Sequence, residues 1–217
     1  MKENPSFDYR TEAHMLAMNK NTQQRLFQCM GRQVRKRPVG YRPYIQALPS
    51  AEKVPNERWT TDLSKVWTAR DSWALVIDCH TRELLGMDLS RSGKSRTAES
   101  VLEQALIARY DCLGKVQTSF LLRSGNGLVF SRRSYTTLIK SYGLKQEFIT
   151  PYRPAQNDLV EWVISTLKDQ CARNHRFEIM KHANRVIGDW IGFYNKQRPF
   201  KAMGMRPPPT ETYALTA

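Results

Sequence analysis

A glutamate and a lysine, Glu161 and Lys168, occur in one short run, residues 151–171, that has the spacing of an amphipathic helix. Apolar residues recur in this run every three or four positions, which predicts a core-facing side made of Val160, Val163, Ile164, Leu167 and Cys171. Glu161 and Lys168 then share another face of the helix, two turns apart. A carboxylate and a cation on one face can hold a metal ion and the phosphate that the ion activates.

The same glutamate also has a purely structural interpretation. Asp158 lies three residues before Glu161, just ahead of the apolar run, as in a capping box whose glutamate reaches back to the N-cap backbone. Helix caps are common and metal-binding carboxylates are rare, so this helix alone favours capping. The choice depends on whether other carboxylates converge on Glu161.

Two aspartates lie inside segments that are predicted to be β-strands. Asp62 follows Trp59, Thr60 and Thr61 in the first strand, and Asp78 lies on the second. An acidic side chain in such a place is unfavourable unless it is hydrogen-bonded or bound to a cation. Both are candidate functional residues, and both are open to the alternative of structural hydrogen bonding, which is commoner for buried polar groups.

The composition points to a polyanionic partner. The 217 residues include 34 Lys and Arg against 20 Asp and Glu, which gives a net charge of +14 and a pI near 9.9. Nucleic acid is the simplest partner for such a chain, although a merely basic soluble protein has the same composition. The cysteines form no close pair, no signal peptide begins the chain and no apolar run reaches membrane-spanning length, so we expect a reduced, cytoplasmic protein without a membrane partner.

Residues 1–37 are predicted to form a short, basic helical segment, followed by a linker over residues 38–54. Seven basic residues and no acid occur between Lys20 and Arg42, and the run at Arg35, Lys36 and Arg37 is a candidate for phosphate contacts. Glycine and prolines favour a linker after it. Six apolar residues of the helical segment are expected to be buried: Ala13, Met15, Leu16, Leu26, Phe27 and Met30.

Residues 55–217 are predicted to form an α/β domain with a mixed sheet and helices packed on it. Strands are expected at residues 58–63, 73–79, 83–89, 116–123 and 146–150, with a tight hairpin turn at residues 80–82. Helices are expected at residues 95–110, at 135–142, around Glu161 and at 181–195. The turn at residues 124–127 ends the fourth strand.

Five segments of this domain resemble the integrase-type catalytic core of bacterial insertion-sequence transposases, namely the second-frame product of the insertion-sequence-three family. The similarity runs from about residue 55 to 213, and residues 18–38 resemble the end of that family's helix-turn-helix segment. The resemblance implies an RNase H-like fold of the retroviral-integrase type, with a mixed five-stranded sheet and flanking helices. The matching segments are RWTTDL, ALVIDCHTRELLGMDLS, FLLRSGNGLVFSRRSY, YGLKQEFITPYRPAQNDLVEWVISTLKDQC and DWIGFYNKQRP.

The resemblance also implies the site. The family uses three carboxylates, of which the first corresponds to Asp62 and the third to Glu161, while the second position holds Gly125. Asp158, Trp162 and Phe200 stand where the family usually has Gly, Arg and His. The implied DNA-binding residues are Lys168, Arg123, Arg35, Lys36, Arg37, Asn157 and Tyr152.

By resemblance the chemistry is phosphoryl transfer on DNA with two divalent ions, Mg²⁺ or Mn²⁺, held by the carboxylates. Asp62 would bridge both ions and Glu161 would hold one, so the chain with Gly125 is expected to be inactive or severely impaired. The implied partners are the element ends and target DNA, further copies of the chain, and a first-frame transposase protein. The alternative is a catalytically silent DNA-binding remnant that interferes with intact transposase.

Overall fold

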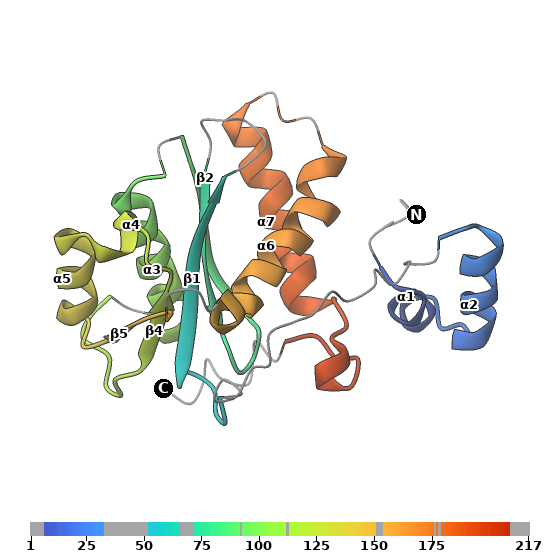
Figure 1. Cartoon of the computed structure of the whole chain (residues 1–217), viewed down its shortest axis with the longest axis horizontal. Coiled ribbons are helices and arrows are strands. Elements are labelled where there is room, and N and C mark those ends of the chain that lie inside the picture. The colour runs from blue at the N-terminus through green and yellow to red at the C-terminus, as the bar shows by residue number, and fades with distance from the viewer. Residues whose placement is uncertain are drawn as a thin grey trace.

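The computed structural model describes residues 7–32, 52–65, 72–91, 93–111, 113–150, 154–175, 177 and 179–208. A five-stranded sheet lies at the centre of this part of the chain, in the order β3-β2-β1-β4-β5 (Figure 1). The first three strands pair antiparallel, and β1, β4 and β5 pair parallel. The strands are β1 (Arg58–Lys65), β2 (Ser72–Asp78), β3 (Leu84–Ser90), β4 (Leu121–Ser124) and β5 (Lys145–Phe148).

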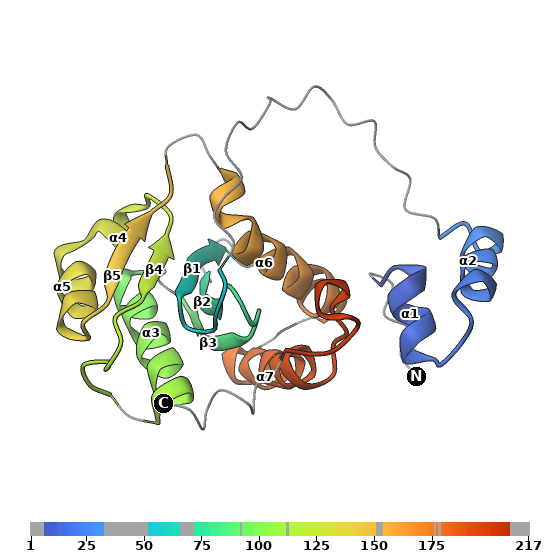
Figure 2. The same cartoon turned by 90° about the horizontal axis from the view of Figure 1, so that it is seen from below.

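Helices cover both faces of the sheet, with α3, α4 and α5 on one side and α6 and α7 on the other (Figures 1 and 2). A separate pair, α1 and α2, lies beyond α6 and α7. The helices are α1 (Tyr9–Met15), α2 (Lys20–Cys29), α3 (Ser95–Tyr110), α4 (Leu128–Ser131), α5 (Arg133–Ser141), α6 (Asp158–Gln170) and α7 (Met180–Lys196). Short 3-10 turns occupy Pro154–Asn157, Ala172–Asn174 and Lys201–Met203.

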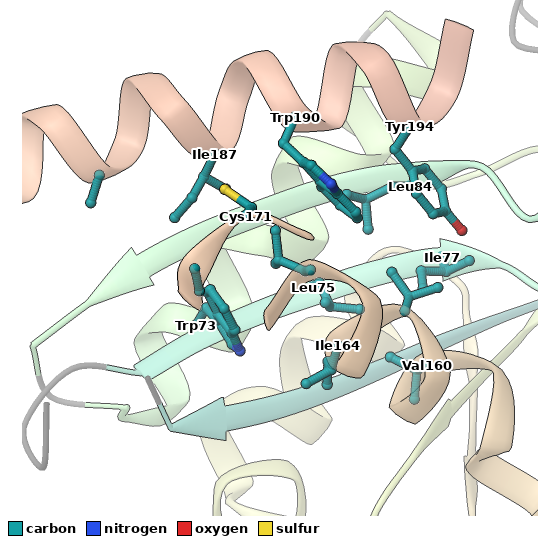
Figure 3. Close-up of a cluster of buried hydrophobic side chains, with 14 of the residues drawn as sticks. Trp73, Leu75, Ile77, Leu84, Val160, Ile164, Cys171, Ile187, Trp190 and Tyr194 are labelled. Carbon is teal, nitrogen blue, oxygen red and sulfur yellow. The ribbon is translucent and has the colours of Figure 1, made fainter. Parts of the chain in front are cut away.

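Strand β2 shows how the two cores arise, because every one of its residues is buried. Trp73, Leu75 and Ile77 point to the α6 and α7 side, where they pack with the apolar face of both helices (Figure 3). Ala74 and Val76 alternate with them and pack against α3 on the other side. The sequence of a strand that is covered on both faces is therefore a continuous apolar run.

Glycine is required at one point of the second core. A Cβ added to Gly86 on β3 would lie 2.7 Å from the Val101 carbonyl oxygen and 3.2 Å from the Ala105 amide nitrogen. Helix α3 can approach β3 this closely only because residue 86 has no side chain.

The predicted order of strands and helices is confirmed, with two corrections. The fourth strand begins at Leu121 and not at residue 116, because its partners begin there: Leu121 pairs with Arg58 on β1 and with Lys145 on β5. Helix α4 was not predicted, since its four residues are too few to show a helical period. The amphipathic pattern of α6 is confirmed in full, because all five predicted core residues are buried.

The N-terminal helices α1 and α2 contact each other. Asp8 caps α1 by accepting a hydrogen bond from the Thr11 amide at 2.9 Å. Of the six residues expected to be buried here, Ala13 and Phe27 are buried, while the other four are exposed: Met15, Leu16, Leu26 and Met30. Two short helices can bury only the faces that meet, so the prediction was wrong for the outer face.

The predicted division at residues 1–37, 38–54 and 55–217 stays a prediction, since residues 33–51 lie outside the described part of the chain. Within that described part, no helix has the length and apolar character needed to cross a membrane.

Candidate active site

Asp62 lies on β1, the central strand of the sheet, where the residues change from buried to half-buried. Burial raises the pKa of its carboxyl group, while a backbone hydrogen bond at Leu63 and the positive charge of Lys168 act in the opposite direction. Asp62 is therefore partly shielded from water and within electrostatic range of Lys168.

Glu161 lies in the first turn of α6, with its side chain exposed. Partial burial raises the pKa of its carboxyl group, and the negative charges of Asp62 and Asp158 raise it further. Helix α6 thus brings Glu161 within electrostatic range of Asp62, although the two residues are far apart in the sequence. This is the convergence of carboxylates on which the choice between capping and chemistry depended.

The capping-box interpretation is wrong for this helix. The N-cap residue is Asn157, and its side chain makes no capping hydrogen bond. Instead the Thr60 hydroxyl on β1 donates to the Asn157 Oδ1 at 2.7 Å, and both residues are buried. The start of α6 is thereby tied to the strand that carries Asp62, because the polar group that could cap the helix is used for this bond.

Arg123 on β4 holds the same helix start from the other side. Its guanidinium donates to the Glu147 carboxylate at 2.7 Å and to the Gln156 carbonyl oxygen at 2.8 Å, and the side chain is 11% exposed. The Arg123 Nε and Nη1 and the Asn157 Oδ1 are thus hydrogen-bonded within the fold, which positions the start of α6 next to Glu161. The predicted DNA contacts of Arg123 and Asn157 stay predictions.

Gly125 follows directly after β4, in the neighbourhood of Asp62. Thr61 on β1 pairs with Ser124 on β4, so the residues that come next, Asp62 within β1 and Gly125 just after β4, lie side by side. A Cβ added at Gly125 would meet no atom within 4 Å. The space that a side chain would need at the second position is therefore open.

Lys168 lies two turns after Glu161 on α6, as predicted. Its ammonium group donates to the Ser64 hydroxyl on β1 at 2.8 Å, two residues beyond Asp62. The sequence analysis missed Ser64 and Thr60, because serine and threonine in a strand carry no signal of such partners.

Asp78 has a structural role. The backbone amides of Asn56 and His80 donate to its carboxylate at 3.0 and 2.8 Å, and the Arg109 guanidinium lies 3.5 Å away. Its side chain is fully buried. The structural alternative therefore holds for this residue.

Four predicted DNA-binding residues lie outside the described part of the chain: Arg35, Lys36, Arg37 and Tyr152. Among the residues that the structure describes, no group of three or more His, Cys, Asp or Glu side chains is arranged to hold a metal ion.

A model of the integrase core domain matches residues 52–154, and a second integrase core model matches residues 142–208. This chain belongs to the integrase core family. An insertion element IS476 protein from Xanthomonas euvesicatoria is 30% identical over 176 residues, which make up 80% of this chain and 48% of that protein. The putative transposase InsK of insertion sequence element IS150 from Escherichia coli K12 is 27% identical over 156 residues, 70% of this chain and 53% of that protein. The chain thus spans about half the length of these relatives.

Solved structures show the fold of this integrase core. The catalytic core domain of BIV integrase matches with a TM-score of 0.53 and 19% identity, over 70% of this chain and 91% of that one. A chain of the simian T-cell lymphotropic virus intasome in complex with a PP2A regulatory subunit matches with a TM-score of 0.57 and 14% identity, over 95% and 71%. The predicted RNase H-like fold is confirmed.

Proposed function

We propose that this chain is the catalytic core of an insertion-sequence transposase that binds DNA and whose phosphoryl-transfer activity is lost or severely impaired at Gly125. One observation carries the proposal: β1 and α6 bring Asp62 and Glu161 together, while the residue beside Asp62 at the end of β4 has no side chain. The insertion-sequence relatives support the transposase class.

The donor set fits one divalent ion. Hard cations such as Mg²⁺ and Mn²⁺ prefer carboxylate oxygens, which Asp62 and Glu161 supply from facing elements. A second ion would need an anionic ligand at residue 125, where no side chain exists. One fold neighbour, the HTLV-2 integrase catalytic core domain, was solved in complex with magnesium, with a TM-score of 0.51 and 13% identity over 68% of this chain and 91% of that one.

When bound, a divalent ion would polarise the scissile phosphate and lower the pKa of the attacking water. Asp62 and Glu161 would hold this ion, and Lys168 would contact the phosphate. Thr60 and Arg123 keep the start of α6 in place, so that Glu161 stays opposite Asp62.

The proposed partners are DNA, further copies of the chain and a first-frame transposase protein. The net charge of +14 supports DNA, because Lys and Arg side chains gain free energy by releasing the counterions of phosphates. Two of the fold neighbours, an intasome and a dimeric catalytic core, are assemblies. We place the protein in the bacterial cytoplasm, on the nucleoid when it binds DNA.

Manganese binding tests the proposed site without requiring activity. We expect the parent chain to bind a single Mn²⁺ in an isothermal titration, and Asp62→Asn to abolish that binding. Gly125→Asp should add a second ion, because it restores an anionic ligand in open space. Binding that survives the loss of both Asp62 and Glu161 would place the metal elsewhere and contradict the proposal.

A second function, interference with intact transposase, is favoured by Gly125 itself, because DNA binding does not depend on that residue. An inhibitor of this kind should lower strand transfer by an active relative when the two are mixed on the same element ends. Unchanged strand transfer at saturating amounts of this chain would exclude that role.

A further inference from the structure

A basic segment begins at the last residue of α7 and takes no part in the candidate active site. Residues 196–206 include four basic residues and no acid, the basic ones being Lys196, Arg198, Lys201 and Arg206. Figures 1 and 2 show this segment in red, on the side of the core where α1 lies.

Arg198 is the buried centre of this segment. Only 8% of the residue is exposed, and its guanidinium carbon lies 5.2 Å from the ring centre of Phe7, 5.3 Å from Trp162 and 5.7 Å from Phe200. Its Nη1 donates to the Gln170 side-chain oxygen, but its Nε has no hydrogen-bond partner. None of the ion pairs between described residues supplies a carboxylate to Arg198. A guanidinium in this state is suited to an incoming anion.

Two N-terminal residues cover this cation. Phe7 is buried against the Arg198 guanidinium and lies 6.3 Å from the Phe193 ring. The next residue, Asp8, forms an ion pair with Lys201. A nucleotide could make the same two contacts, because its base can stack on the guanidinium as Phe7 does and its phosphate can pair with the lysine as Asp8 does.

Two aromatic residues of this surface surround the same guanidinium. The ring centres of Trp162 and Phe200 lie 5.8 Å apart. Trp162 is 40% exposed, so one part of its ring remains available for stacking.

We propose that Trp162, Arg198, Phe200 and Lys201 form a second nucleic-acid contact, and that Phe7 and Asp8 cover it when DNA is absent. The inference rests on the proposed function as a DNA-binding protein. DNA and the N-terminal residues then compete for the same groups. Removing the cover increases DNA affinity, and bound DNA displaces Phe7 and Asp8 from the core.

The test is a fluorescence-anisotropy titration of the full chain with a labelled single-stranded oligonucleotide of mixed sequence, at one low salt concentration. Phe7→Ala/Asp8→Asn should bind about threefold to tenfold more tightly than a control, since an exposed ion pair and a cation–π contact each contribute on this scale. The matched control is Asp111→Asn, which removes one exposed negative charge at the end of α3, on the opposite face of the sheet from α7. Asp8→Asn alone should show part of the gain, and it leaves Phe7 in place should the double variant lose its N-terminal fold.

Lys201→Ala separates displacement of Phe7 and Asp8 from a general charge effect. It should lower DNA affinity little in the parent chain, where Lys201 is paired with Asp8, and more strongly in the uncovered variant, Phe7→Ala/Asp8→Asn. Equal affinity of the uncovered variant and the Asp111→Asn control, or the same loss from Lys201→Ala in both backgrounds, would overturn the inference. A parent chain that binds no DNA at low salt would instead contradict the proposed function.

Discussion

Replacing Thr60 by Val tests whether β1 holds the start of α6. The Thr60 hydroxyl and the Asn157 Oδ1 are 2.7 Å apart, and the two residues are 2% and 3% exposed. Valine has nearly the same volume, so the change removes the hydrogen bond and leaves the Asn157 oxygen buried without this partner. Such a loss lowers the free energy of unfolding by about 1–3 kcal/mol.

Urea denaturation of Thr60→Val measures that loss, and two controls separate it from other effects. Thr60→Ser keeps the hydroxyl and should retain most of the bond. Thr136→Val removes a hydroxyl that donates to the Arg133 carbonyl oxygen at an exposed site, and should change stability by less than about 0.5 kcal/mol. If Thr60→Val were as stable as the parent, the bond would not hold α6, and our account of how Glu161 is placed would be wrong.

Three further predictions concern packing, titration and DNA binding. Gly86→Ala should lower the free energy of unfolding by about 1–3 kcal/mol in urea denaturation, because the new Cβ would meet the backbone of α3. Gly188→Ala on α7, where a Cβ meets no atom within 4 Å, should raise it by about 0.5–1 kcal/mol. Equal effects of the two changes would contradict the close approach of α3 to β3. Burial raises the pKa of Glu83 to about 7, above its value in the unfolded chain, although the positive charge of Arg109 opposes this shift. The protonated Glu83 side chain therefore contributes stability that is fully present below about pH 4.5 and is lost as the pH rises through about 7. Glu83→Gln should remove that part of the stability profile, and a variant with the parent's pH dependence would refute the assignment. Affinity for duplex DNA should fall steeply between 50 and 200 mM salt, by analogy with proteins that make several phosphate contacts, and a salt-independent dissociation constant would exclude such contacts.

The sequence predicted β2 and α6 well because each has a clear apolar pattern. Strand β2 is a short, continuous apolar run, whereas the apolar residues of α6 recur with a helical period. The start of β4 could not be predicted in the same way. Residues 116–120 have strand-like composition but lie beyond the ends of β1 and β5, so no described strand runs beside them.

The site could be predicted only in part. Asp62 and Glu161 could be proposed from their places in a strand and a helix, and Gly125 only from the family resemblance. The hydrogen bonds around them come from residues without a sequence signal, such as Thr60 and Ser64. Arg123 shows the opposite case. A basic residue next to a predicted site suggests a DNA contact, yet its carboxylate partner Glu147 lies on the neighbouring strand, and only the strand pairing reveals it.

The most direct test of the central claim is a nicking and strand-transfer assay on oligonucleotides carrying the ends of the parent element, in Mg²⁺ and in Mn²⁺. It compares the natural chain with Gly125→Asp and with Gly125→Asp/Glu161→Gln. We predict that only Gly125→Asp reacts, at least about 10²-fold faster than the natural chain, because a lost electrostatic contact to the transition state has effects of this size. A natural chain that already reacts and loses its activity on Glu161→Gln would contradict the account, since another group would then fill the place of the second carboxylate.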